Sequence, residues 1–366
     1  MKRVMKRILG VLIIAVVVLA LSPLISLVFP EKLTRHTYYR LVYNLIADQE
    51  TKGASSDESK ARRLFQYVID HEFVRGEPFK AKPFESLIYA QGYCDFQART
   101  LNSLLASAGI KSRYAMLLDK DGISPHTLNE VFLEGRWCAF DTLMNIIFED
   151  GEGNKLSLEQ LSDHPDLILG QTKLAALKDY DRGQFERFKN WYSRMFPMPA
   201  LPRRSNPLLL QSHIFDRISD AYSRIFKRRF FDFYQDLYLR FKKKYPREDF
   251  RFFFKARNYH LAYRYDLALS SYNSLIERFP ESEYAGDAHF FLGVLYFDTG
   301  LLSKSAVFFR DLIKKYPQEW GSSGYYYLAK VYAAMGKKKE SLKAYSNADI
   351  YELSAQTIGQ LTNKGD

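Results

Sequence analysis

Three polar side chains of different chemical types follow one another in the first half of the chain. Cys94 lies in Gly92-Tyr93-Cys94, His126 begins the run His-Thr-Leu-Asn-Glu-Val, and Asp141 ends the run Trp-Cys-Ala-Phe-Asp. A thiolate nucleophile needs a base that accepts its proton, and the base needs a third group that fixes its tautomer. These residue types predict a catalytic triad of Cys94, His126 and Asp141.

Cys94 is expected to begin a helix. Apolar residues recur after it at helical spacing, and Gly109 stops the pattern. A cysteine at a helix N-terminus lies at the positive end of the peptide dipoles, which favours the reactive thiolate. The backbone N–H of Cys94 is predicted to help hold the oxyanion of an acyl-transfer intermediate.

The other two residues are expected on a β-hairpin. Residues 113–118 are typical of a strand, and residues 126–133 and 136–142 read as two further strands joined by Glu134-Gly135. A two-residue loop places Leu128 opposite Asp141, with His126 as the diagonal neighbour on the same face, roughly 7–8 Å away between backbones. Cys138 falls on the other face.

A metal site built from Cys94, His126 and Cys138 is the alternative reading of the same residues. No Cys-x-x-Cys pair or His-x-x-x-His pair supports it, and the hairpin register directs Cys138 away from the other two. We therefore expect neither a metal nor a cofactor.

This block resembles the transglutaminase-like superfamily over about residues 60–150. The shared motifs are Gly-x-Cys at the start of a helix that ends near Ala108-Gly109-Ile110, then His-x-x-Asn-Glu-Val, then Gly-Arg-Trp-x-x-x-Asp. The resemblance implies an α+β papain-like core, in which the helix bearing the Cys packs on an antiparallel sheet, and a Cys-His-Asp triad. Leu128 stands where the family usually has Trp, and Thr142-Leu143 replaces the usual Pro-Thr.

The N-terminal segment suggests a membrane anchor. Lys2, Arg3, Lys6 and Arg7 precede a largely apolar run over residues 8–29, which is long enough to span a bilayer as a helix. The positive flank predicts a cytoplasmic N-terminus, which places the bulk of the chain outside the cytoplasm, periplasmic or on the cell surface. A signal peptide cleaved after Ala20 is the alternative. The net charge of +11 suits anionic surfaces, and no nucleic-acid partner is expected.

The sequence predicts two folded domains. We expect an anchor over residues 1–30, a transglutaminase-like domain over 31–175, a helical and Pro-rich linker over 176–214, helical repeats over 215–350 and a tail over 351–366. Pro246 and Pro280 are 34 residues apart, with Tyr238 and Tyr272 eight residues before them. This period resembles the tetratricopeptide repeat, whose all-α solenoids present a concave surface to peptides or proteins.

These expectations combine into a predicted function. The chain is predicted to be a membrane-anchored, extracytoplasmic cysteine enzyme that acts on amide or peptide bonds of a protein or peptide by thiol acyl transfer. Its repeats would recruit a protein partner. The resemblance favours hydrolysis over cross-linking. The alternative is a catalytically inactive transglutaminase-like and repeat scaffold in cell-envelope or surface-polysaccharide assembly.

Overall fold

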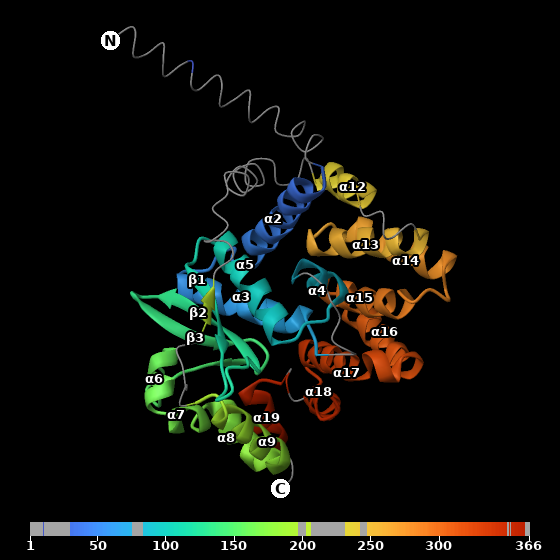
Figure 1. Ribbon diagram of the computed structural model, residues 1–366. Coiled ribbons are helices and arrows are strands. Elements are labelled where there is room, and N and C mark those ends of the chain that lie inside the picture. Colours follow the sequence, from blue (N-terminus) through green and yellow to red (C-terminus); the bar gives the residue numbers. More distant parts are fainter. Residues whose placement is uncertain are drawn as a thin grey trace.

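A small antiparallel sheet and many helices build the protein (Figure 1). The computed structural model describes residues 10, 30–74, 83–196, 203–205, 231–241, 247–349, 351 and 353–362. The sheet has five strands in the order β4-β3-β2-β1-β5, and all neighbouring strands are antiparallel. Its strands are β1 (Ser112–Leu117), β2 (His126–Leu133), β3 (Arg136–Asp141), β4 (Ile146–Ile147) and β5 (Arg203–Ser205).

The central hairpin has the predicted register. Leu133 pairs with Arg136, and Val131 pairs with Cys138. Glu134 and Gly135 form the two-residue loop, with φ of 50° and 83°. Positive φ at both residues is the geometry of a type I′ turn, whose twist matches that of the flanking strands. The register therefore follows from the turn, and it sets which side chains of β2 and β3 share a face.

Each face of the sheet is covered by its own set of helices. Val131, Cys138 and Phe140 belong to a core shared with one set, whereas Leu128 and Ala139 face the other. The first set is α2 (Pro30–Glu50), α3 (Asp57–His71), α4 (Pro83–Tyr89) and α5 (Cys94–Ser107). The second set is α6 (Leu158–Asp163), α7 (Asp166–Leu169), α8 (Thr172–Tyr180) and α9 (Arg182–Ser193).

The C-terminal part is helical and is consistent with a repeat solenoid. Its helices are α12 (Phe231–Phe241), α13 (Glu248–Leu261), α14 (Tyr265–Arg278), α15 (Ala285–Asp298), α16 (Leu302–Lys315), α17 (Pro317–Ala334), α18 (Lys338–Tyr345) and α19 (Ala355–Thr362). The Ser305 hydroxyl donates to the Gly293 carbonyl at 2.8 Å, and the Ser341 hydroxyl donates to the Ala329 carbonyl at 2.9 Å. The same hydrogen bond, from a serine hydroxyl to a backbone carbonyl, therefore joins α16 to α15 and α18 to α17. The tetratricopeptide identity and a partner on the repeat surface stay predictions.

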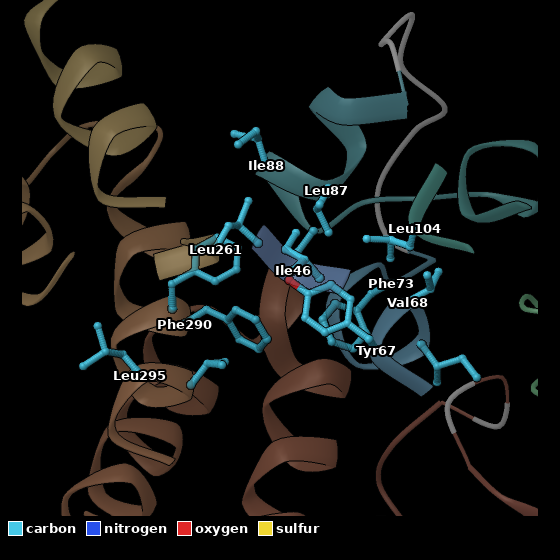
Figure 2. Packing of buried hydrophobic residues seen from close by; sticks show 14 of the residues in the cluster. Ile46, Tyr67, Val68, Phe73, Leu87, Ile88, Leu104, Leu261, Phe290 and Leu295 are labelled. Carbon is cyan, nitrogen blue, oxygen red and sulfur yellow. The ribbon is translucent and has the colours of Figure 1, made fainter. Parts of the chain in front are cut away.

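The two parts share one hydrophobic core. Residues of α2, α3 and α5 and residues of α12 to α18 belong to a single buried cluster. Figure 2 shows this contact, where Ile46 of α2, Tyr67 of α3 and Phe73, two residues after α3, approach Leu261 and Phe290 from the repeat helices. Packing therefore crosses the boundary between the two predicted domains. The domain bounds themselves, including the linker over 176–214, stay predictions.

The expected transmembrane helix is not found, and the predicted fold class is corrected on this point. Within the described ranges, no helix combines the length and the apolar character that crossing a bilayer requires. The predicted span over residues 8–29 lies outside the described residues, apart from Gly10. The single-pass membrane location with an extracytoplasmic bulk is withdrawn with it. What the structure shows is a small antiparallel sheet with many helices.

Candidate active site

His126 and Asp141 meet at one end of the hairpin, as the register predicts. His126 is the first residue of β2 and Asp141 is the last residue of β3. The His126 Nε2 atom lies 2.7 Å from Asp141 Oδ2, and both side chains are fully buried. Because a carboxylate only accepts hydrogen bonds, Nε2 carries the proton. The other ring nitrogen, Nδ1, is left to act as the base.

Cys94 is held beside this pair by the packing of its helix. It is the first residue of α5 and is partly exposed. One turn later, the Ala98 carbonyl accepts a hydrogen bond from Asn129 Nδ2 at 2.8 Å. Asn129 lies three residues after His126 on β2, so this bond fixes the start of the helix next to the histidine. Cys94 also interacts with the His126 ring through its side chain.

Nδ1 of His126 is buried and forms no regular hydrogen bond to any group in the described part of the chain. The Cys94 thiol interacts electrostatically with the ring in addition to Asp141. The imidazole is therefore tied to a carboxylate through one nitrogen, while the other remains available for proton transfer. This is the division of roles that a thiol–imidazole–carboxylate triad needs.

The electrostatics favour a charged imidazole. Burial acts to lower the pKa of His126, but the Asp141 carboxylate and then Cys94 outweigh it and raise this pKa to about 10. Burial likewise acts to raise the pKa of Asp141, but His126, Tyr192 and the backbone N–H of Met144 hold it below its usual value. Both directions describe an imidazolium paired with a carboxylate at neutral pH.

Asp141 has two further donors. The Tyr192 hydroxyl donates to Asp141 Oδ2 at 2.7 Å, and the Met144 N–H donates to Oδ1 at 3.0 Å. The Trp191 ring lies over His126, with 4.4 Å between ring centroids. Tyr192 and Trp191 come from α9, whose N-cap is Asp181. This helix therefore closes the site from the side of the sheet opposite the core that contains Cys138.

Sequence reasoning missed Trp191 and Tyr192. It assigned their segment to a helical and Pro-rich linker over residues 176–214, whereas the structure has two helices, α8 and α9, on either side of Asp181. The sequence contained part of the signal for the start of α9, because Asp is a typical N-cap residue. In the structure, the Asp181 side chain accepts a hydrogen bond from the Gln184 N–H. Nothing local indicated that the helix would return to Asp141, 51 residues earlier in the chain.

The remaining motif residues build the frame of the site. A Cβ atom on Gly92, two residues before Cys94, would collide with the Glu72 carboxyl group, so a side chain there would have to displace Glu72. Glu130 is fully buried and accepts from Arg113 Nε at 2.7 Å, and the Arg113 guanidinium stacks 3.9 Å from the Trp137 ring. Glu130 and Trp137 therefore bind β1 to the hairpin.

Cys138 lies apart from the site. It is buried in the core on the other face of the sheet, with Val131 and Phe140. Across the described ranges, no group of three His, Cys, Asp or Glu side chains is arranged to hold a metal ion. The structure thus brings together the three residues of the predicted triad and leaves Cys138 out.

The comparisons with known proteins identify the class of domain. Residues 45–142 match the family model described as the transglutaminase-like superfamily, and this part of the chain is a transglutaminase-like domain. The matched range ends one residue after Asp141 and includes Cys94 and His126. No curated protein and no solved structure matches the chain.

Proposed function

We propose that the protein is a cysteine enzyme that transfers acyl groups from amide substrates. The observation that carries this proposal is the buried bond of 2.7 Å between His126 Nε2 and Asp141 Oδ2, next to a partly exposed Cys94 at a helix N-terminus. The transglutaminase-like domain over residues 45–142 supports the same class of chemistry. The chemistry of the thiol, the imidazole and the carboxylate assigns a role to each of Cys94, His126 and Asp141.

In the proposed first half-reaction, the proton of the thiol resides on His126 Nδ1. The Cys94 thiolate attacks the amide carbonyl carbon, and the carbonyl π electrons move onto oxygen. N–H groups in the first turn of α5 lack intrahelical acceptors, and that of Cys94 would stabilise this oxyanion. The C–N bond then breaks, the leaving amine takes the proton from His126, and a thioester remains on Cys94.

In the second half-reaction, an acyl acceptor gives its proton to neutral His126 and attacks the thioester carbonyl. The C–S bond breaks and restores the thiolate–imidazolium pair. With water as the acceptor the product is a carboxylic acid, and with an amine it is a new amide. Asp141 keeps the imidazole oriented in both steps and stabilises the imidazolium. We propose water as the acyl acceptor, and assays of ammonia release and of amine incorporation distinguish water from an amine.

The test compares the two cysteines of the chain. Wild type, Cys94→Ala and Cys138→Ala are treated with iodoacetamide at neutral pH, and alkylation is located by mass spectrometry. We expect rapid alkylation at Cys94 in wild type and Cys138→Ala, and slow alkylation at buried Cys138 in all proteins that contain it. Glutamine-containing peptides are then assayed for ammonia release and for incorporation of a fluorescent alkylamine.

Ammonia release without amine incorporation identifies a hydrolase, whereas incorporation identifies cross-linking chemistry. Both must be lost in Cys94→Ala and kept in Cys138→Ala. If Cys94 is alkylated no faster in the folded protein than in the unfolded chain, and His126→Ala leaves that rate unchanged, the enzyme proposal fails. The inactive scaffold is then the better description.

A further inference from the structure

Glu72 is a buried carboxyl group beside the loop that leads to Cys94. It follows the last residue of α3, and only 1% of its surface is exposed. Its backbone carbonyl accepts a hydrogen bond from Gln97 Nε2, in the first turn of α5, at 2.9 Å. Glu72 therefore contacts the helix that begins at Cys94, although neither half-reaction proposed for Cys94 uses its carboxyl group.

The backbone next to Glu72 holds this loop in place. Phe73, the following residue, is buried in the core shared by the two parts and is labelled in Figure 2. The Phe73 N–H donates to the Ala90 carbonyl at 3.2 Å, and the Gly92 N–H donates to the Phe73 carbonyl at 3.0 Å. Because consecutive Cα atoms are about 3.8 Å apart, the Cα atoms of Gly92 and Cys94 are separated by at most about 7.6 Å.

The Glu72 side chain packs directly on Gly92. A Cβ atom on Gly92 would collide with Glu72 Oε2 and would lie 3.1 Å from Gln97 Cγ. The carboxyl group of Glu72 therefore supports the chain two residues before Cys94. A movement of this carboxyl group would remove the support on one side of Gly92.

Several acceptor atoms without donors gather at this contact. Glu72 Oε1, Glu72 Oε2 and Gln97 Oε1 are buried, and none of them forms a regular hydrogen bond to any group in the described part of the chain. An ionised carboxylate offers only acceptors, and its burial without donors or a countercharge costs free energy. A protonated carboxyl group brings one O–H donor to the same place. The geometry therefore favours the neutral acid.

The groups around Glu72 lead to the same protonation state. The charged, titratable and hydroxyl groups that face it come from α2, α4, α5 and α13, and they are Tyr43, Ser86, Asp95, Thr100 and Arg257. Burial raises the pKa of Glu72 to about 8 against the effect of the two hydroxyls, while Asp95 raises it and Arg257 lowers it. Burial and Glu72 also raise the pKa of Tyr43, which is neutral. Glu72 is therefore mostly protonated at neutral pH.

We propose that Glu72 is a positioning residue for Cys94, which supports Gly92 and the start of α5 as a neutral acid and releases them when it ionises. The inference rests on the proposed function, because the placement of Cys94 matters only if its thiol is the nucleophile. When the proton passes to solvent, a buried carboxylate remains near Asp95, and it gains free energy by moving toward water. The site would thus lose its geometry at alkaline pH.

The first measurement tests whether Glu72 is neutral in the folded protein, by denaturant unfolding of wild type and Glu72→Gln from about pH 5 to about pH 9. A carboxyl group with a raised folded pKa stabilises most below its unfolded value, about 4.3, and loses this contribution as pH rises through about 8. The unfolding equilibrium constant of wild type should therefore rise relative to that of Glu72→Gln by about tenfold per pH unit and level off above about pH 8.

The second measurement tests whether Cys94 responds to this proton. The chain contains two cysteines, so labelling cysteine Cβ with carbon-13 gives two NMR signals, which Cys94→Ala and Cys138→Ala assign. We expect the Cys94 signal of wild type to shift in a step with its midpoint near pH 8, and the step to be absent from Glu72→Gln. The signal of Cys138, on the other face of the sheet, should show no such step.

Hydrogen exchange measures the release of the loop. After correction for the intrinsic pH dependence of exchange, the protection of amides in residues 90–97 should fall by about tenfold in wild type as pH rises through 8, and stay constant in Glu72→Gln. Amides of α17 are the internal control and should keep their protection. Glu277→Gln, which makes the same substitution at an exposed position of α14, should behave as wild type in all three measurements.

Four outcomes would overturn the proposal. A constant ratio of the two unfolding equilibrium constants would mean that Glu72 is ionised in the folded protein. A step at Cys94 in both proteins, near the ordinary thiol value of about 8.5, would also contradict the proposed function. Without any step near pH 8, rapid alkylation of Cys94 at neutral pH would keep the proposed function and reject the role of Glu72. Failure of Glu72→Gln to fold would contradict the proposal as well, because the amide matches the neutral acid in shape and supplies an N–H donor.

Discussion

Asp141 Oδ2 accepts from both His126 and Tyr192, each at 2.7 Å. A charged acceptor in a buried site depends on its donors, because a lost bond is not replaced by water. Removing the Tyr192 hydroxyl should therefore raise the pKa of Asp141, because the carboxylate loses a donor, and should loosen the hold of Asp141 on His126. We regard Tyr192 as a positioning residue, since it acts on the thiol only through Asp141 and His126.

Tyr192→Phe should lower the free energy of unfolding by about 1–3 kcal/mol. It should also slow alkylation of Cys94 at neutral pH and shift the pH profile of that reaction. Tyr332→Phe, which removes the same hydroxyl from α17, is the control. If Tyr192→Phe loses stability but keeps the wild-type pH profile of alkylation, Tyr192 has only a structural role.

The shifted pKa of His126 predicts how stability depends on pH. A histidine whose folded pKa is raised to about 10 contributes stability fully below its unfolded value, about 6.5, and loses this contribution as pH rises through 10. Asp141, whose pKa is lowered, contributes above about pH 4 and loses its contribution as pH falls. The pair should therefore stabilise most between about pH 4 and 6.5.

Denaturant unfolding of wild type and Asp141→Asn across pH 4–10 measures this effect. Asp141→Asn removes the charge that raises the pKa of His126, so the decline in stability between pH 6.5 and 10 should become shallower. The same slope in both proteins would mean that other groups produce the pH dependence. The rate of Cys94 alkylation should change with pH for the same reason. Above about pH 10, where His126 is neutral, this rate should no longer depend on His126.

Local rules of strands and turns were sufficient to predict the hairpin that carries two site residues. Glu134-Gly135 sets the loop, and alternation along β2 and β3 then places His126 and Asp141 on one face and Cys138 on the other. The helix that begins at Cys94 followed equally well from its apolar spacing. Helix α9 was assigned to a linker because its contact with Asp141 joins residues that are 51 positions apart, which a local pattern does not encode.

The close approach of α15 and α16 predicts that the same substitution at two glycines changes stability in opposite directions. A Cβ atom on Gly293 of α15 would lie 2.8 Å from the Phe309 ring of α16, whereas one on Gly321 of α17 would meet no atom within 4 Å. Gly293→Ala should therefore destabilise the protein by about 1–3 kcal/mol through overpacking. Gly321→Ala should stabilise it by roughly 0.5–1 kcal/mol, because alanine loses less backbone entropy in a helix.

Thermal and denaturant unfolding of the two variants gives the comparison directly. The substitution, the type of element and the added methyl group are the same, so only the neighbour of the new Cβ differs. Equal changes in stability for both variants would mean that α15 and α16 do not approach each other as closely as the small residues in the repeat pattern indicate. The prediction thus tests the repeat packing without reference to any partner.

The whole molecule is stabilised by contacts that join α3 to the repeat helix α17. Asp70 Oδ1 accepts from Lys330 Nζ and from the Tyr326 hydroxyl, both at 2.8 Å, and the Asp70 carbonyl accepts from the Tyr327 hydroxyl at 2.7 Å. The Tyr326 and Tyr327 rings also pack against Phe73. Sequence analysis placed these residues in separate domains, because no local pattern relates positions more than 250 residues apart.

Asp70→Ala removes the carboxylate that links the two parts. Burial acts to raise the pKa of Asp70, but Lys330 and Tyr326 hold it below its usual value. Its contribution is thus present above about pH 4 and is lost as pH falls. We expect a loss of about 2–4 kcal/mol at pH 7, because Lys330 and Tyr326 would keep their burial without their acceptor. Asp57→Ala on the same helix breaks an exposed pair with Lys60 and should cost about 1 kcal/mol or less.

Hydrogen exchange tests whether the contacts of Asp70 with α17 make the two parts of the molecule unfold together. If α3 and α17 unfold as one unit, Asp70→Ala lowers the protection of amides in both helices by the same free energy, and that change equals the loss in global stability. If only α17 loses protection, the repeats open independently of the transglutaminase-like domain. Because the shared core extends from α2 to α18, we expect the first result, with a single unfolding transition in wild type and in both variants.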